Sequence, residues 1–134
     1  STIKNCMKKS SLAILLLRCG FTAVFAWFGA SQITDPAVWT GLIPAWLVRI
    51  TGISAQSVVF ANGAGDLALA ALLTLGWHTP IVAAIASAHL FIIAADLGLN
   101  DISVRDIGLA ISLAALALLT WPTAAGSATE AKQT

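Results

Sequence analysis

The segment PIVAAIASAHLFIIAADLGL, from Pro80 to Leu99, carries the strongest structural signal in the chain. Its 20 residues include only two ionisable side chains, His89 and Asp96. The hydrocarbon core of a bilayer is about 30 Å thick, and a helix of about 20 predominantly apolar residues crosses it. Proline suits the first turn of a helix, where its missing N–H leaves no bond unmade. The segment therefore predicts a membrane-spanning helix that begins near Pro80.

Three further segments of the chain have the same character. They run from about Ser11 to Ile33, from about Ala55 to Gly76, and from about Val104 to Trp121, where Pro122 ends the pattern. The composition agrees, because 58% of the 134 residues are hydrophobic and only 10% are charged, whereas a soluble domain carries about 25% charged residues. We expect an all-α membrane protein, an up-down-up-down bundle of four transmembrane helices that occupies residues 11–122.

Composition also limits the partners and cofactors of the chain. A net charge of +1 provides no basic patch for nucleic acid, and two cysteines provide no disulfide framework. No His, Cys, Asp or Glu cluster has metal-ligand spacing. His78 and His89 are displaced by about 16 Å along a helix, too far to ligate one haem. We therefore expect no metal site and no covalently bound cofactor, which leaves a lipid among the candidate ligands.

The connection at residues 34–54 is the only long one. Apolar side chains recur in it at helical spacing, with Pro44 as an interruption: Trp39, Leu42, Ile43, Trp46, Leu47 and Ile50. This pattern predicts a short amphipathic segment in the plane of the lipid head groups, because it is too short for a fifth crossing.

The distribution of Lys and Arg predicts the orientation of the bundle. With four crossings, Lys4, Lys8, Lys9 and Lys132 fall on one side, and Arg49 and Arg105 fall on the other. Loops and ends rich in Lys and Arg stay in the cytoplasm. We therefore expect a cytoplasmic N-terminal tail at residues 1–10 and a polar, disordered cytoplasmic tail at residues 123–134.

Several polar side chains fall inside the predicted spans, where each ionisable group costs about 2.5–3.5 kcal/mol. Spacings of three and four residues align Arg18 with Gln32, place Asn62 and Asp66 on one helix face, and leave His89 near the same depth. An Arg stem reaches about 6–7 Å, so Arg18 is expected to pair with Asp66. The sequence thus predicts a buried polar pocket formed by Arg18, Gln32, Asn62, Asp66 and His89.

Two interpretations of this pocket stay open. It binds a polar head group or relays protons, or it contains an ion pair that only fixes helix register. His89 is equally consistent with a hydrogen bond that supports helix packing. Glycine next to Asp66, in the run Gly63–Asp66, and the Gly108–Ser112 pair are expected to allow close helix contact.

A second polar group maps to the outer interface of the membrane. Its members are Asp35, Arg49, Asp96, Asp101, Arg105 and Asp106. They are either charges in hydrated loops or a docking surface for a partner subunit. Asp106 is expected to lie in the first turn of the last helix, where a carboxylate complements the helix dipole.

The order and spacing of several short motifs resemble the DoxX-like family of small four-helix bacterial membrane proteins. The matching segments are Leu16–Arg18, Trp27–Gln32, Asp35–Pro36, Ile43–Leu47, Gly63–Asp66 and Arg105–Leu109. This chain has Gln32 where the family often has Lys, and Asp66 where the family often has Glu. The resemblance implies a bacterial inner membrane protein close to quinone and electron-transfer chemistry.

Three functions are compatible with these features. The first is a non-catalytic accessory subunit of a larger membrane electron-transfer complex, with lipids and other membrane subunits as partners. The second is a quinone-interacting oxidoreductase subunit in which Arg18, Asp66 and His89 bind or protonate the quinone. The third is a small proton-coupled transporter. Whether the chain is an enzyme stays open, and a role without catalysis of its own is favoured.

Overall fold

The computed structural model describes residues 1–122, so the tail predicted at residues 123–134 lies outside the described part. The elements follow in this order: α1 (Thr2–Thr34), η1 (Pro36–Val38), η2 (Thr40–Leu42), α2 (Ala45–Thr51), α3 (Ala55–Leu75), α4 (Thr79–Leu97) and α5 (Asp101–Thr120). The four long helices α1, α3, α4 and α5 are long and apolar enough to cross a membrane. The predicted all-α fold is confirmed, and the chain is a small multi-pass integral membrane protein.

Local chemistry explains where the spans begin and end. The side chain of Ser54 accepts a hydrogen bond from the Ser57 N–H at 3.2 Å before α3, and Asn100 accepts one from the Ser103 N–H at 3.0 Å before α5. Such caps satisfy backbone donors that the first turn leaves free. α3 ends at Gly76, whose φ of +69° is favourable for glycine and closes the helix.

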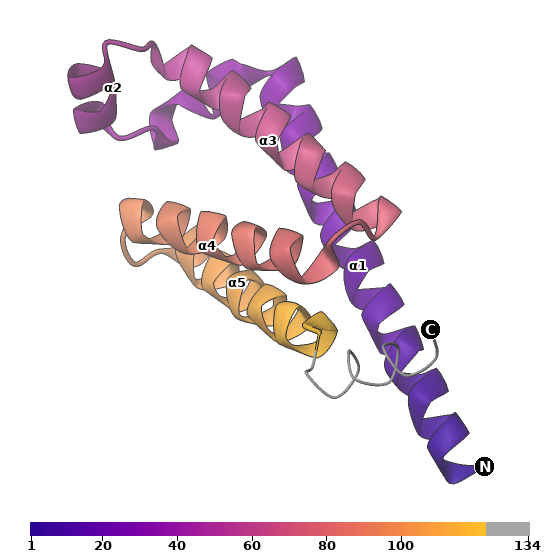
Figure 1. The fold of residues 1–134 in the computed structure, drawn as a ribbon. Helices are drawn as coiled ribbons and strands as arrows, with labels where there is room; N and C mark the ends of the chain where they lie inside the picture. The colour runs from indigo at the N-terminus through magenta and orange to yellow at the C-terminus, as the bar shows by residue number, and fades with distance from the viewer. Residues whose placement is uncertain (123–134) are drawn as a thin grey trace.

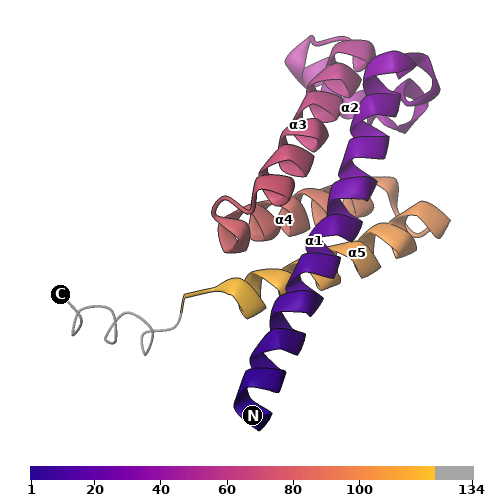
Figure 2. The ribbon, with the colours of Figure 1, turned by 90° about the vertical axis from the view of Figure 1, so that its right-hand side faces the viewer.

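α1 is longer than the span predicted from Ser11 to Ile33, because it begins at Thr2. No glycine or proline occurs before Gly20, and Lys, Met, Leu and Ala are good helix formers, so nothing ends the helix at the membrane boundary. Its 33 residues correspond to about 50 Å. The N-terminal end of α1 therefore projects beyond the other helices (Figures 1 and 2).

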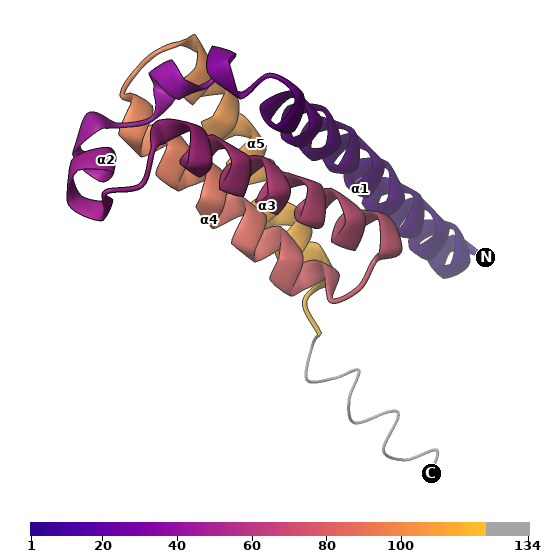
Figure 3. The same cartoon turned by 90° about the horizontal axis from the view of Figure 1, so that it is seen from above.

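The connection between the first two spans is bent rather than continuous. Two 3-10 turns precede α2, which has only seven residues. Pro44 stands at the N-cap of α2 with extended backbone, which breaks the helical pattern at the predicted position. This segment lies at the opposite end of the molecule from the N-terminus (Figure 3).

The bundle consists of two tightly packed helix pairs, α1 with α3 and α4 with α5, that contact each other much less. The α3–α4 turn at residues 76–78 joins the pairs at one end, and they diverge toward the end that carries α2 (Figure 1). The apolar core fills the half near the turn. It is built from Phe21, Phe25, Leu73, Val82, Leu113 and Leu116, among others.

Glycine sets the contact between α1 and α3. A Cβ on Gly29 would lie 2.8 Å from the carbonyl oxygen of Gly63, and a Cβ on Gly63 would lie 2.9 Å from the Cβ of Gln32. The expected close contact at Gly63 is therefore confirmed. A Cβ on Gly65 or Gly108 would have no atom within 4 Å. The prediction that these two glycines allow close contact between helices of this chain is therefore wrong.

Candidate functional site

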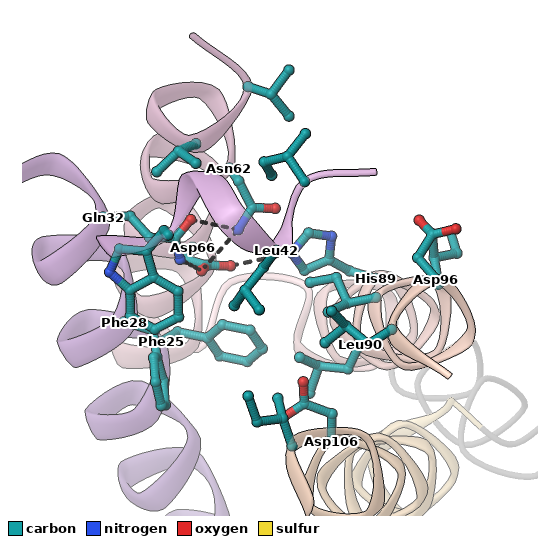
Figure 4. Close-up of a pocket in the computed structure, with 18 of the residues that line it drawn as sticks. Phe25, Phe28, Gln32, Leu42, Asn62, Asp66, His89, Leu90, Asp96 and Asp106 are labelled. Atoms are coloured by element: carbon teal, nitrogen blue, oxygen red, sulfur yellow. Dashed lines mark hydrogen bonds and ion pairs between the residues drawn. The ribbon is translucent and has the colours of Figure 1, made fainter. Parts of the chain in front are cut away.

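A cavity of about 250 Å³ lies between the two helix pairs, in the half of the bundle where they diverge. All four long helices contribute to its walls, and the bent connection adds Trp39, Leu42 and Leu47. Most of the lining is apolar. Figure 4 shows Gln32, Asn62, Asp66 and His89 gathered at one place on this wall, with Asp96 and Asp106 apart from them.

Asp66 is the centre of this polar group. It lies in the middle of α3 and is only 5% exposed. Its Oδ2 accepts a hydrogen bond from Gln32 Nε2 at 2.9 Å and a longer one from Asn62 Nδ2 at 3.4 Å. Asn62 Nδ2 also donates to Gln32 Oε1 at 2.8 Å. Both amides therefore donate hydrogen bonds to the same carboxylate oxygen.

The α1–α3 contact brings these three residues together. Asn62 and Asp66 are four residues apart and share a face of α3. Gln32 follows Gly29 by three residues, so the Gly29–Gly63 contact places it level with Asp66. Sequence spacing predicted each face correctly, and the glycine contact provides the register between them.

His89 approaches the other carboxylate oxygen from α4. Its Nε2 lies 3.2 Å from Asp66 Oδ1, close enough for an ion pair when the imidazole is protonated. The arrangement does not have hydrogen-bond geometry, and Oδ1 is buried without a hydrogen-bond partner in the described part of the chain. A buried acceptor without a partner costs about 1–3 kcal/mol. A donor brought by a ligand would remove that cost.

The structure brings four of the five predicted pocket residues together: Gln32, Asn62, Asp66 and His89 all line the cavity. Arg18 does not. Its Nε donates to the carbonyl oxygen of Leu73 at 2.9 Å, and its Nη2 donates to that of Thr74 at 2.9 Å. The predicted pairing of Arg18 with Asp66 is therefore wrong.

Helix geometry explains this difference. Arg18 precedes Gln32 by 14 residues on one continuous helix, which separates them by about 21 Å, far beyond the reach of the side chain. Side chains in a helix also lean toward its N-terminus, which directs Arg18 away from Asp66. The last carbonyls of α3 lack helical partners and carry the negative end of the helix dipole, so they attract the guanidinium.

The predicted outer group divides into two sets. Asp96, Arg105 and Asp106 line the cavity, whereas Asp35, Arg49 and Asp101 are exposed and do not. The expectation that Asp106 lies in the first turn of α5 is wrong. The helix begins at Asp101, after the Asn100 cap, so Asp101 occupies the first turn and Asp106 is buried farther along.

Arg105 connects α5 to α1 at the cavity wall. Its Nε and Nη2 donate to Asp106 Oδ1 at 2.9 and 2.8 Å, and its guanidinium lies 4.8 Å from the centre of the Phe28 ring. The Phe28 ring meets Trp39 edge-on at 5.6 Å. Phe28 and Trp39 were not among the predicted site residues. Phe28 shares the three- and four-residue spacing of Phe25 and Gln32, which was the available signal.

The residues at the cavity determine what it can bind. Within residues 1–122, no three His, Cys, Asp or Glu side chains lie close enough to hold a metal ion. The polar wall instead offers carboxylates, amides and an imidazole as hydrogen-bond and ion-pair partners for an organic molecule.

Comparisons with protein-family models, with curated proteins and with solved structures returned no match. The resemblance to the DoxX-like family stays a prediction. The membrane architecture rests on the four long apolar helices themselves.

Proposed function

We propose that the protein binds an amphipathic molecule from the bilayer in the cavity between its two helix pairs. The observation that carries this proposal is Asp66 Oδ1, a buried carboxylate oxygen at the cavity without a hydrogen-bond partner. A polar head group at Asp66 supplies the missing donor. The apolar body of the same molecule then contacts the surrounding aliphatic and aromatic walls.

The character of the cavity supports this function. Ligand sites are typically concave and mostly apolar, with a few fixed polar groups, and enclose about 300–1,000 Å³. A volume of about 250 Å³ lies just below this range and suits a small head group with the first part of an acyl or alkyl chain. The cavity lies where the helix pairs diverge, so a molecule from the bilayer reaches it without displacement of the apolar core.

Photolabelling tests the proposal. The full chain, purified into lipid nanodiscs, is irradiated with a neutral fatty alcohol that carries a diazirine, and labelled peptides are identified by mass spectrometry. We expect label on cavity residues of α1 and α4. Ile93→Trp fills the cavity from α4 and should reduce this label about tenfold, equivalent to about 1.4 kcal/mol of binding free energy.

Ile111→Trp is the matched control, because Ile111 is 57% exposed and does not line the cavity. This variant should keep the cavity label. Label confined to the lipid-facing surface of the helices, and equal in both variants, would contradict the proposal.

A second candidate function is that of an accessory subunit in a larger membrane assembly, for which an electron-transfer complex is the expected setting. The observation that favours it is an exposed apolar surface on the N-terminal half of α1, where Leu12, Leu15 and Leu16 are half or more exposed. Purification in a mild detergent should return a defined partner at fixed stoichiometry. Replacement of these three leucines by alanine should release the partner, and recovery of the chain alone contradicts this function.

The quinone hypothesis draws support from the Asp66–His89 pair, which places an acceptor and an imidazole 3.2 Å apart at the cavity wall. A quinol hydroxyl could donate to Asp66 while His89 faces the same ring. The double variant His89→Ala, Asp66→Asn should then lose bound quinone. Unchanged quinone occupancy in that variant contradicts the hypothesis.

A further inference from the structure

We infer that the head group bound at Asp66 is an organic cation, an ammonium group attached to an apolar body. This inference rests on the proposed function, because it requires that the cavity binds an amphipathic molecule. The inference specifies the sign of the charge on that molecule, which we derive from the charged side chains that line the cavity.

Three carboxylates line the cavity, those of Asp66, Asp96 and Asp106, against two basic side chains, those of Arg105 and His89. Arg105 directs both its Nε and its Nη2 to Asp106 at 2.9 and 2.8 Å, so these two charges neutralise each other. In the described part of the chain, Asp66 has one basic neighbour within 4.0 Å, His89 at 3.2 Å, and Asp96 has none. The cavity therefore holds an excess of negative charge.

Hydrogen bonding at Asp66 selects a donor. Oδ2 already accepts from the amides of Gln32 and Asn62, while Oδ1 has no hydrogen-bond partner. An ammonium group offers three donors and no acceptor, so it can satisfy Oδ1 and place its positive charge beside the carboxylate. A quinone carbonyl or a phosphate offers only acceptors, which face Oδ1 unfavourably. A hydroxyl can donate but brings no charge.

The surroundings strengthen the attraction between the two charges. Opposite charges attract more strongly in an apolar environment than in water, and Asp66 is 5% exposed. Phe25 also lines the cavity, and an aromatic ring face attracts a cation. Asp96 is exposed and lies seven residues beyond His89 on α4, toward the end where the two helix pairs diverge (Figure 1). A carboxylate in that place raises the local concentration of cations.

Competition against the photolabel measures the charge preference. The labelled full chain in zwitterionic nanodiscs is titrated with decylammonium, decanol and decyl sulfate, which share one chain and differ in head group. We expect decylammonium to suppress the cavity label at a concentration about tenfold lower than decanol does, a difference of about 1.4 kcal/mol. Decyl sulfate should be weaker still. A lysophospholipid with an ethanolamine head group, added in parallel, shows whether the amine comes from a membrane lipid or from a free amphiphile.

Asp66→Asn keeps the size of the side chain and removes its charge. It should abolish the preference for decylammonium over decanol, measured as the ratio of the two titration midpoints within the same variant. Asp35→Asn, at an exposed carboxylate outside the cavity, should retain the full preference. The wild-type titration series alone decides the question if Asp66→Asn fails to fold.

The outcomes separate the two proposals. Equal competition by decylammonium and decanol overturns the cation inference and leaves a binding site for neutral amphiphiles. Stronger competition by decyl sulfate also overturns it. Absence of label from the cavity in every condition overturns the proposed function itself.

Discussion

At the scale of single residues, Gly29 and Gly63 fix the position of the polar group. Their backbones approach so closely that a Cβ on either one meets the opposite helix at 2.8 to 3.0 Å. This contact puts Gln32 beside Asp66 and Arg18 beside the last turn of α3. Spacing along one helix identified the right faces, but only the contact between two helices decides which polar residues meet.

Gly63→Ala should therefore destabilise the protein, because the added methyl group requires α1 and α3 to move apart. Overpacking of a tight contact typically costs about 1–3 kcal/mol. The thermal midpoint in detergent, followed by circular dichroism, measures the change. Gly65→Ala is the matched control on the same helix, where nothing lies within 4 Å of the new Cβ. An equal loss of stability in both variants would show that the close contact is absent.

Gln32 provides a second prediction at this scale, because it makes the shorter of the two amide hydrogen bonds to Asp66. Gln32→Lys introduces an ammonium beside the carboxylate that Gln32 contacts at 2.9 Å. The variant should lose the preference for decylammonium over decanol in the competition assay, since Asp66 gains an internal partner. Gln56→Lys, at an exposed position early in α3, should retain it. A preference that survives Gln32→Lys places the cation away from Asp66.

At the scale of elements, composition and caps explain why the helices form. The starts of α1 and α5 differ from the predicted positions, and each difference has a local cause. α1 continues back to Thr2 because no residue there breaks a helix, and α5 begins at Asp101 because Asn100 caps it. Arg18 interacts with the C-terminal end of α3 because the free carbonyls of Leu73 and Thr74 lie within its reach. Hydrophobic periodicity carries no information about such end contacts.

Arg18→Ala and Asp66→Ala should therefore act independently. Arg18→Ala removes two hydrogen bonds to α3, worth about 0.5–1.5 kcal/mol each, and should speed amide exchange in the last turn of α3 only. Stability losses at sites without shared partners add within about 0.3–0.5 kcal/mol. The double variant should lose the sum of the two single losses. A rescue in the double variant would restore the pairing that the sequence predicted.

At the scale of the whole molecule, the division into two helix pairs could not be predicted from the sequence. All four spans have similar apolar composition, and the lipid environment gives no hydrophobic drive that would choose one pairing over another. The choice depends on specific contacts, such as Gly29 with Gly63 and the hydrogen bond from Ser87 Oγ to the carbonyl oxygen of Ala110 at 2.7 Å. The cavity is a consequence of that pairing.

The orientation of the molecule decides which side of the membrane the cavity faces, and the native cysteines allow a direct test. The cavity lies at the end that carries residues 34–54, and the Lys-rich N-terminus of α1 lies at the other end, which predicts a cavity toward the extracytoplasmic side.

Cys19→Ser leaves Cys6 as the single thiol. A membrane-impermeant maleimide should label this variant only after intact cells are permeabilised. Cys6→Ser, Cys19→Ser, Thr51→Cys, with its thiol on the connection, should be labelled without permeabilisation. The reverse pattern would place the cavity and its carboxylates on the cytoplasmic side, where amphipathic cations would have to arrive from within the cell.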